Sequence, residues 1–197
     1  MAAAARLRRL RTELTGPATV GELNALLGRE GVGLLVFFIA IPFLQPIPLA
    51  GIGTPIGLAL MALGVQLTQG RGAPALPASL AGRKLEAETV ARLLSGAERV
   101  LAAVESFAKP RGPALFRSGF LLGPAVVLLG LLLATPFYVP FGNPFTGLPL
   151  ALIGLALMEE DGLMAGLGLL GTVITYAYHA AFAKLAWAAA KALFARF

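Results

Sequence analysis

The sequence predicts an all-α membrane protein: two repeats of Pro-broken or re-entrant helical hairpins, a C-terminal transmembrane helix and amphipathic interfacial helices. Three observations support this fold class: an apolar composition, long stretches without charge, and one Pro-rich motif that occurs twice. Hydrophobic residues make up 57% of the chain, charged residues 13%, and the mean hydropathy is +0.81. A soluble domain usually carries about a quarter charged residues, so a membrane protein is the first interpretation.

Charged residues are missing from three long stretches of the chain. No Asp, Glu, Lys or Arg occurs in residues 31–70, 118–158 or 162–183. A helix needs about 20 apolar residues to cross a bilayer, so we expect two crossings in each of the first two stretches and one in the third. Backbone groups in lipid must hydrogen-bond internally, which favours helices here.

The first segment, residues 1–30, is predicted to form amphipathic helices on the cytoplasmic or interfacial side. Leu residues share a helical face over residues 3–14 and Arg residues surround it, which indicates a short basic helix. Thr19 and Glu22 then have the spacing of a capping box, which predicts the start of the next helix. That helix leads into the first apolar stretch.

Residues 31–70 and 118–161 are predicted to be two copies of one hairpin. Sliding the chain over itself by 94 positions matches eleven identical residues across the thirty from Leu34 to Leu63, without a gap. The matches that composition explains least are Pro42 with Pro136, Phe43 with Phe137, Pro46 with Pro140, and Pro55 with Pro149. The sequence therefore predicts an internal duplication.

The prolines predict a helix break in each copy, because proline lacks a backbone donor and clashes with the carbonyl four residues back. We expect these breaks at Pro42, Pro46 and Pro48 in the first copy and at Pro136, Pro140 and Pro144 in the second. Pro55 and Pro149 are expected in the first turn of the helix that follows each break.

The two breaks are expected to face each other across a pseudo-twofold axis. In transporters, interrupted segments at matching places in two halves mark a binding site near the midplane. Gln45 and Asn143 are candidates to bond the freed carbonyls. The candidate substrate-binding residues are Pro42, Phe43, Gln45, Pro46, Pro136, Phe137, Tyr138, Pro140 and Asn143. Two alternatives stay open: the prolines shape only a tight turn near one membrane surface, and the repeats are either parallel or inverted.

The central segment, residues 71–117, is predicted to be a linker and an amphipathic helix over residues 84–108. Its apolar stripe and charged opposite face favour a helix that lies on the membrane surface or packs on the apolar segments. Most basic residues precede residue 118, so the positive-inside rule places the N-terminus and this segment in the cytoplasm. Candidates to bind anionic headgroups are Arg71, Arg83, Lys84, Lys109 and Arg111.

The last segment, residues 162–197, is predicted to be a transmembrane helix with a basic tail. The acidic residues 159–161 before it are interpreted as a solvated helix end. Tyr176, Tyr178 and His179 are typical interface anchors, and residues 182–197 are expected to form a further, partly amphipathic helix. Glycines between residues 162 and 171 favour close helix contacts, either within the chain or in a homodimer. We expect a homodimer.

The composition disfavours catalysis, metal binding and nucleic-acid binding. One histidine and no cysteine occur in the sequence, which removes most zinc sites and most nucleophile–base pairs. The net charge of +6 is assigned to lipid binding, because basic residues of membrane chains face anionic headgroups on the cytoplasmic side. We therefore expect no metal, no cofactor, no nucleic-acid partner and no enzymatic activity.

Four motifs follow one another between residues 17 and 180. They are Thr19-Val-Gly-Glu-Leu before a Gly-rich stretch, Ile41-Pro-Phe with Pro46-Ile-Pro, Pro136-Phe-Tyr-Val-Pro-Phe-Gly-Asn-Pro, and Glu160-Asp-Gly. In the order of these motifs the chain resembles the ExoD family, which is linked to exopolysaccharide synthesis. No catalytic residue is carried over from the resemblance.

The resemblance implies a multi-pass protein of the bacterial inner membrane that acts in exopolysaccharide synthesis or export. Combined with the broken segments, it leads us to expect that the chain binds or translocates an anionic lipid-linked saccharide carrier, with membrane lipids around it. The alternative is a non-transporting scaffold that organises an exopolysaccharide synthase complex through its cytoplasmic helix.

Overall fold

The computed structural model describes residues 16–46, 51–70, 73–75, 78–104, 111, 118–135 and 139–194. This part of the chain is mostly helical, as predicted, with one short two-stranded sheet. The predicted helix over residues 3–14 lies outside the described residues. The elements are β1 (Ala18–Thr19), α2 (Val20–Ala40), the 3-10 helix η1 (Ile41–Leu44), α3 (Gly53–Thr68), α4 (Ala78–Ala81), β2 (Lys84–Leu85), α5 (Ala87–Val104), α6 (Gly119–Ala134), α7 (Gly142–Glu159) and α8 (Gly162–Phe194).

Helix α2 begins at the predicted capping box. The Glu22 amide donates to Thr19 Oγ1 over 3.2 Å, and the Thr19 amide donates to Glu22 Oε2 over 2.7 Å. Strand β1 pairs antiparallel with β2, and the Val20 amide donates to the Arg83 carbonyl. The start of α2 is thus held by the side-chain hydrogen bonds of its capping box and by backbone hydrogen bonds to the central segment.

Helix α2 changes direction sharply at Gly28. This residue has φ 54° and ψ −132°, a combination that is open to glycine and strained for other residues. The parts Val20–Gly28 and Gly31–Leu44 therefore meet at 106°. The first part joins a small apolar cluster with α5, and the second part enters the main core.

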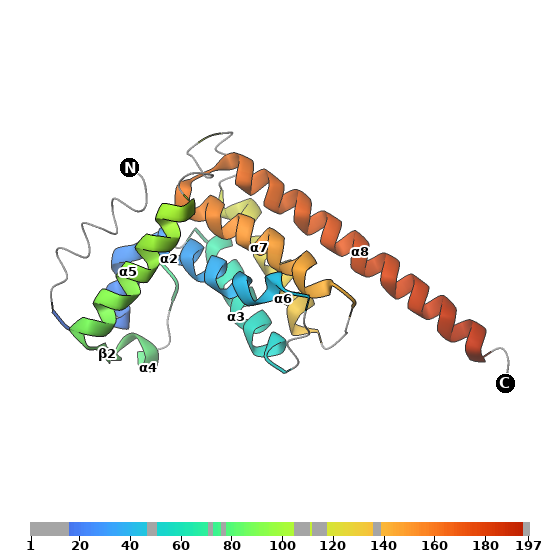
Figure 1. Cartoon of the computed structure of the whole chain (residues 1–197), viewed down its shortest axis with the longest axis horizontal. Helices are drawn as coiled ribbons and strands as arrows, with labels where there is room; N and C mark the ends of the chain where they lie inside the picture. Colours follow the sequence, from blue (N-terminus) through green and yellow to red (C-terminus); the bar gives the residue numbers. More distant parts are fainter. Residues whose placement is uncertain are drawn as a thin grey trace.

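The main core lies between helices that pack in antiparallel pairs. Helix α3 packs along α6, α2 along α7, and α7 along α8 (Figure 1). A Cβ added to Gly130 would lie 2.7 Å from the Gly57 carbonyl, and one added to Gly154 would lie 2.9 Å from the Gly33 carbonyl. Glycine lets the backbones approach this closely, as in many membrane helix pairs. The largest fully buried side chains include Val36, Phe43, Leu60, Leu122, Leu129, Leu150 and Ile153.

The prolines interrupt the first copy as predicted. Helix α2 ends at Ala40 and a 3-10 turn carries Pro42, while Pro55 lies in the first turn of α3. In the second copy α6 ends at Ala134, and the next two residues of the predicted break, Pro136 and Phe137, lie outside the described residues.

The prediction for Pro149 is wrong, because α7 begins at Gly142 and Pro149 lies inside it. A proline there leaves the carbonyl of Phe145, four residues back, without its helical donor. The Thr175 hydroxyl of α8 donates to that carbonyl instead. The helix therefore continues through Pro149 because a neighbouring helix supplies the missing hydrogen bond.

Helix α8 is one continuous helix of 33 residues, Gly162–Phe194. The prediction of a separate helix over residues 182–197 is wrong, since the Ala-rich sequence after Tyr178 contains no helix breaker. At 1.5 Å per residue α8 is about 50 Å long. Its first half packs on α7, and its second half extends away from the rest of the molecule (Figure 1).

Helix α8 also carries the candidate membrane span Gly162–Ala192. Among the described residues it is the one helix long and apolar enough to cross a bilayer, or one of two if the bent α2 with η1 counts as a span. Helices α3 and α6 are apolar but have 16 residues each, about 24 Å against a hydrocarbon core of about 30 Å. The five predicted crossings stay a prediction.

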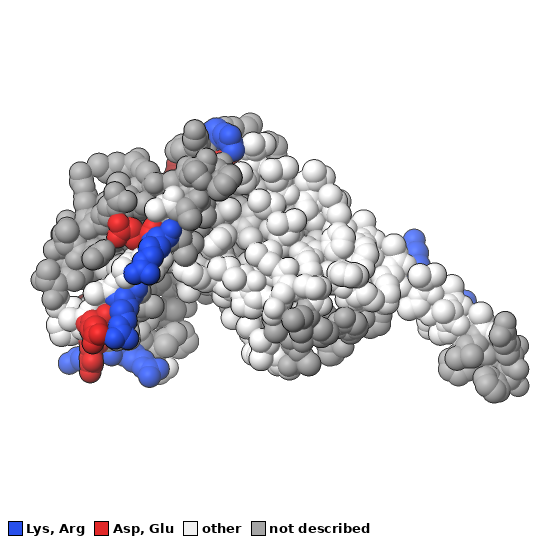
Figure 2. All heavy atoms as spheres, viewed as in Figure 1, with Lys and Arg blue, Asp and Glu red and all other residues white. Residues whose placement is uncertain are grey.

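The charged residues are separated from the helical body. Figure 2 shows Lys, Arg, Asp and Glu gathered mainly over α5 and the adjacent end of the molecule, and a broad uncharged surface over the body. The sequence explains this pattern, because α3 and α6 carry no charged residue and α7 carries one at its last position.

Candidate functional site

Two ends of the helical body contain the predicted site residues. The turn end comprises η1 with Gln45 and Pro46, and residues 139–145 at the start of α7. The polar end comprises β1, β2, α5, Arg111 and residues 159–161. Helix α8 runs from the polar end, where it begins, past the turn end.

At the turn end, the first motif is only partly directed into the protein. Phe43 is 1% exposed and packs on α7, where a Cβ on Gly147 would lie 2.7 Å from the Phe43 carbonyl. Pro42, Gln45 and Pro46 are exposed. Of the four substrate-binding candidates in this motif, the structure therefore places one in the core and three on the surface.

The second motif is described from Val139 onward. Pro136, Phe137 and Tyr138 lie outside the described residues. Pro140 is half-buried, and its carbonyl accepts a hydrogen bond of 2.6 Å from the Tyr178 hydroxyl of α8. Asn143 is half-buried in the first turn of α7. The described part of this motif thus lies against α8.

Three carbonyls around the helix breaks accept hydrogen bonds from hydroxyl groups of other helices. Thr54 donates to the Ala134 carbonyl over 3.1 Å, Tyr178 donates to that of Pro140, and Thr175 donates to that of Phe145. Sequence reasoning expected Gln45 and Asn143 in this role and missed the hydroxyls. The spacing of Thr175 and Tyr178 was the available signal, because residues three apart share a helix face.

Aromatic side chains close the turn end on the α8 side. The rings of Phe145 and Tyr178 are stacked at 4.3 Å, and His179 meets Tyr178 edge-on at 5.8 Å. His179 Nδ1 lies 2.8 Å from the Thr175 carbonyl. Phe141 is 60% exposed and has φ 55°, a left-handed conformation that is rare for an aromatic residue. Tyr178 therefore packs on protein, whereas Phe141 faces outward.

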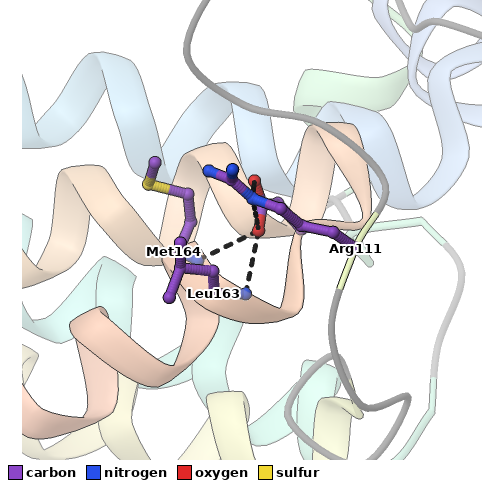
Figure 3. A network of polar contacts seen from close by, with 4 residues as sticks. Arg111, Leu163 and Met164 are labelled. Atoms are coloured by element: carbon purple, nitrogen blue, oxygen red, sulfur yellow. Dashed lines mark hydrogen bonds and ion pairs between the residues drawn. The ribbon is translucent and has the colours of Figure 1, made fainter.

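At the polar end, Asp161 is the centre of a buried polar network. The side chain is 0% exposed. Its Oδ1 accepts from the amides of Leu163 and Met164 over 2.8 and 3.2 Å, and Arg111 Nε donates to Oδ2 over 3.1 Å (Figure 3). The Gly162 amide donates to the Arg111 carbonyl over 2.6 Å. Asp161 thus caps α8 and binds the central segment to its first turn.

The interpretation of residues 159–161 as a solvated helix end is wrong. Glu159 is 4% exposed and Asp161 is 0% exposed, while Glu160 is exposed. The physical reason is that α8 starts at once, and the amides of a helix N-terminus need acceptors and favour a negative charge. An Asp directly before an apolar helical run is a sequence signal for such a cap.

The basic residues predicted to bind headgroups divide into two groups. Arg83 and Lys84 are neighbours and exposed, at the start of β2. Arg111 makes an ion pair with Asp161, so its charge is matched by a buried carboxylate. Arg71 and Lys109 lie outside the described residues. Of the five candidates, the sequence neighbours Arg83 and Lys84 are therefore the two that form an exposed basic pair among the described residues.

Helix α5 packs on the protein through its apolar side. Val90 is 0% and Leu94 4% exposed, and they share a cluster with Ala18, Leu23 and Met158. This favours the predicted alternative in which the amphipathic helix packs on apolar segments. On its outer face Arg92 and Glu88 form an exposed ion pair.

The small residues of α8 contribute to packing within the chain. A Cβ on Gly168 would lie 2.7 Å from Ile153 Cγ1, and one on Gly171 would lie 3.0 Å from Pro149 Cβ. A Cβ added to Gly166 would meet no atom of a neighbouring helix within 4 Å. Gly168 and Gly171 therefore make close contacts within the chain, which was one of the two predicted alternatives. The homodimer stays a prediction.

Comparison with known proteins identifies the family. The model of the family described as "Exopolysaccharide synthesis, ExoD" matches residues 3–181. Protein ExoD of Rhizobium meliloti (strain 1021) is 27% identical over 179 residues, which cover 89% of this chain and 74% of that protein. An uncharacterized protein of Synechocystis, slr1875, is 25% identical over 163 residues, 81% of this chain and 76% of that protein. No solved structure matches. With nearly the whole chain matched, and the predicted resemblance confirmed, this protein belongs to the ExoD family.

Proposed function

We propose that this protein acts in exopolysaccharide synthesis from within the bacterial inner membrane, as a multi-pass protein that binds or moves an anionic lipid-linked saccharide carrier. The family supports the role in exopolysaccharide synthesis. The observation that carries the membrane part of the proposal is the surface of the helical body. It combines large exposed apolar side chains with an absence of charged residues over the whole of α3 and α6.

The apolar surface extends over every helix of the body. Soluble proteins rarely expose contiguous apolar patches larger than a few hundred Å², whereas lipid is a favourable environment for such side chains. The exposed residues include Leu35 and Phe38 of α2, Leu58 and Val65 of α3, Leu128 and Leu131 of α6, Leu148 of α7, and Leu167, Leu170, Val173 and Ile174 of α8.

The packing of the helices supports two interlocked repeats. The offset of 94 residues relates α2 to α6 and α3 to α7, and a twofold rotation would then exchange the pair α2–α7 with the pair α6–α3. These are the pairs that pack on each other. At one such contact a Cβ on Gly33 would meet Met158, and at the matching contact a Cβ on Gly64 would meet Val127. The offset of 94 residues relates Gly33 to Val127 and Gly64 to Met158, so the two contacts are equivalent under the repeat.

The length of α8 indicates how deep the other elements lie in the proposed membrane position. Its uncharged part, residues 162–183, is about 33 Å long, close to a hydrocarbon thickness of about 30 Å. The turn end contacts α8 between Thr175 and His179, about 20–25 Å from its start. In this position the helix breaks lie in the far leaflet and form turns near one surface, which favours that alternative over a cavity at the midplane.

The carrier would then be held at the side of the body. Its lipid tail would lie on the uncharged helical surface, and its phosphate would meet Arg83 and Lys84 at the cytoplasmic interface. A basic residue near an anionic membrane surface contributes about 1 kcal/mol, which corresponds to about fivefold in affinity for each charge.

The test is binding and movement of a fluorescent polyprenyl-phosphate sugar by the full chain in vesicles. We expect R83Q/K84Q to weaken binding by about one order of magnitude or more. The matched control is R92Q, which removes an exposed arginine of α5 that is paired with Glu88. Equal binding by R83Q/K84Q and wild type, or no binding at all, would overturn the carrier proposal. Failure of the chain to float with vesicles would overturn its membrane position.

A scaffold for a synthase complex is the second candidate, because α5 presents an exposed charged face. Val90 and Leu94 are buried within the chain, so a partner would bind the outer side with Glu88 and Arg92. The arms of the experiment separate the two candidates. Loss of carrier binding and movement in R83Q/K84Q with intact pull-down of synthase proteins favours the carrier, and the opposite effects of E88K/R92E favour the scaffold.

A further inference from the structure

The distal part of α8, residues 183–194, extends away from the body. Thr175, Tyr176 and Tyr178, which precede this part, donate hydrogen bonds to carbonyls outside α8. Beyond Tyr178 most side chains are exposed, with Leu185 at 68% and Trp187 at 65%. This distal segment is a straight continuation of the helix (Figure 1).

The distal segment is basic and carries one tryptophan. Lys184 and Lys191 are seven residues apart, so they lie on the same helix face. Lys191 Nζ lies 5.5 Å from the centre of the Trp187 ring, which is a cation–π contact. No Asp or Glu follows Asp161 in the sequence. The segment therefore has uncompensated positive charge beside an aromatic side chain.

The length of α8 places these residues, given the membrane position proposed above. The uncharged part ends at Ala183, and Lys184 follows at the far end of a stretch of about 33 Å. Tryptophan prefers the level of the headgroups, and lysine extends its ammonium toward them while its alkyl chain stays in apolar surroundings. Trp187 and the two lysines thus lie at the headgroup level, which the chemistry of both residue types favours.

We propose that the distal segment of α8 is an anchor for anionic phospholipid headgroups on the far side of the membrane. Lys184 and Lys191 bind phosphate oxygens, and Trp187 lies at the headgroup level between them. This proposal rests on the membrane position of the body but not on the carrier. A second copy of the chain is the competing occupant of the exposed surface, and charge decides between the two, because two lysine-bearing helices would repel each other.

Trp187 makes the proposal directly measurable, because it is the single tryptophan of the chain. The full chain is reconstituted in phosphatidylcholine vesicles with increasing fractions of phosphatidylglycerol. Tryptophan emission is recorded, and quenching is compared between lipids brominated near the headgroup and lipids brominated deep in the acyl chain. We expect strongest quenching by the shallow label and an emission change that saturates with phosphatidylglycerol.

Substitution of the lysines tests their role. In K184Q and in K191Q we expect the apparent affinity for phosphatidylglycerol to fall about fivefold each, and in the double variant the dependence should vanish. R92Q on α5 is the matched control and should behave as wild type. The depth of Trp187 should stay shallow in all variants, since the tryptophan itself sets it.

Three results would overturn the anchor. They are quenching by iodide in water without quenching by lipid, preferential quenching by the deep label, and an emission that follows the protein-to-lipid ratio rather than phosphatidylglycerol. The last result would indicate a second copy. Flotation of the same vesicles reports separately whether the chain is membrane-bound, so failure of the anchor and failure of the membrane proposal give different outcomes.

Discussion

The turn end and the polar end satisfy unpaired backbone groups in different ways. At the polar end carboxylates accept from the first amides of a helix, as Asp161 does for α8. At the turn end neutral hydroxyls donate to carbonyls left open by prolines and helix ends, as Thr175 and Tyr178 do. In the membrane position proposed above, the turn end lies in lipid, where charges are costly. Carboxylates therefore serve as partners at the polar end and neutral hydroxyls at the turn end.

Replacing Asp161 with Ala is expected to have the largest effect. It removes the cap of α8 and leaves the Arg111 guanidinium without its buried partner, which we expect to cost about 3 kcal/mol in the free energy of unfolding. Thermal unfolding in detergent, followed by circular dichroism, measures this loss. D161N is the control, because Asn still caps a helix well and should lose about half as much. Equal losses in both variants would show that the charge, not the cap, is decisive.

Replacing Thr175 with Val tests the turn end, and Pro149 supplies a double-mutant cycle. T175V should cost about 1 kcal/mol or more, because the Phe145 carbonyl is left without a donor. In P149A the new amide can bond that carbonyl, so T175V should cost much less in this background. Unfolding of the four proteins gives the coupling energy. If T175V costs the same in both backgrounds, the hydroxyl does not replace the missing amide.

Replacing Glu22 is expected to have the smallest effect on the free energy of unfolding, and this effect depends on pH. The Thr19 amide and then the Thr19 side chain, both bonded to its carboxylate, lower the pKa of Glu22 from 4.5. Because the pKa is lower in the folded state, this stabilisation is present above the unfolded value and is lost as pH falls through the folded value. Titrating unfolding downward from neutral pH should show a decline below about pH 4.5 that is flatter in E22Q. If stability falls with pH in parallel for wild type and E22Q, the Glu22 carboxylate does not contribute to it.

Local signals predicted the local structure well. The capping box at Thr19, the helix end before Pro42 and the position of Pro55 each depend on interactions within a few residues, and each was confirmed. The helical fold class followed from composition in the same way. These features need no knowledge of the neighbours in space.

The errors arose where a distant helix changes the outcome. Asp161 was interpreted as solvated because its partner Arg111 lies fifty residues earlier in the sequence, and the local signal for a helix cap was not used. Pro149 was expected at a helix start because Thr175 lies on another helix. Sequence symmetry also did not report that Pro42, Gln45 and Pro46 are exposed, and their role as substrate-binding residues stays a prediction.

The packing of α2 on α7, rather than on α3, affects the order in which the chain can fold during its synthesis. Helix α2 barely touches α3 and packs instead on α7, which is synthesised much later. The core-facing side of α2 therefore stays without its final partner until α7 has been translated. Nascent chains that stop before Gly142 should be degraded, whereas the two halves made as separate polypeptides should find each other and complete the bundle.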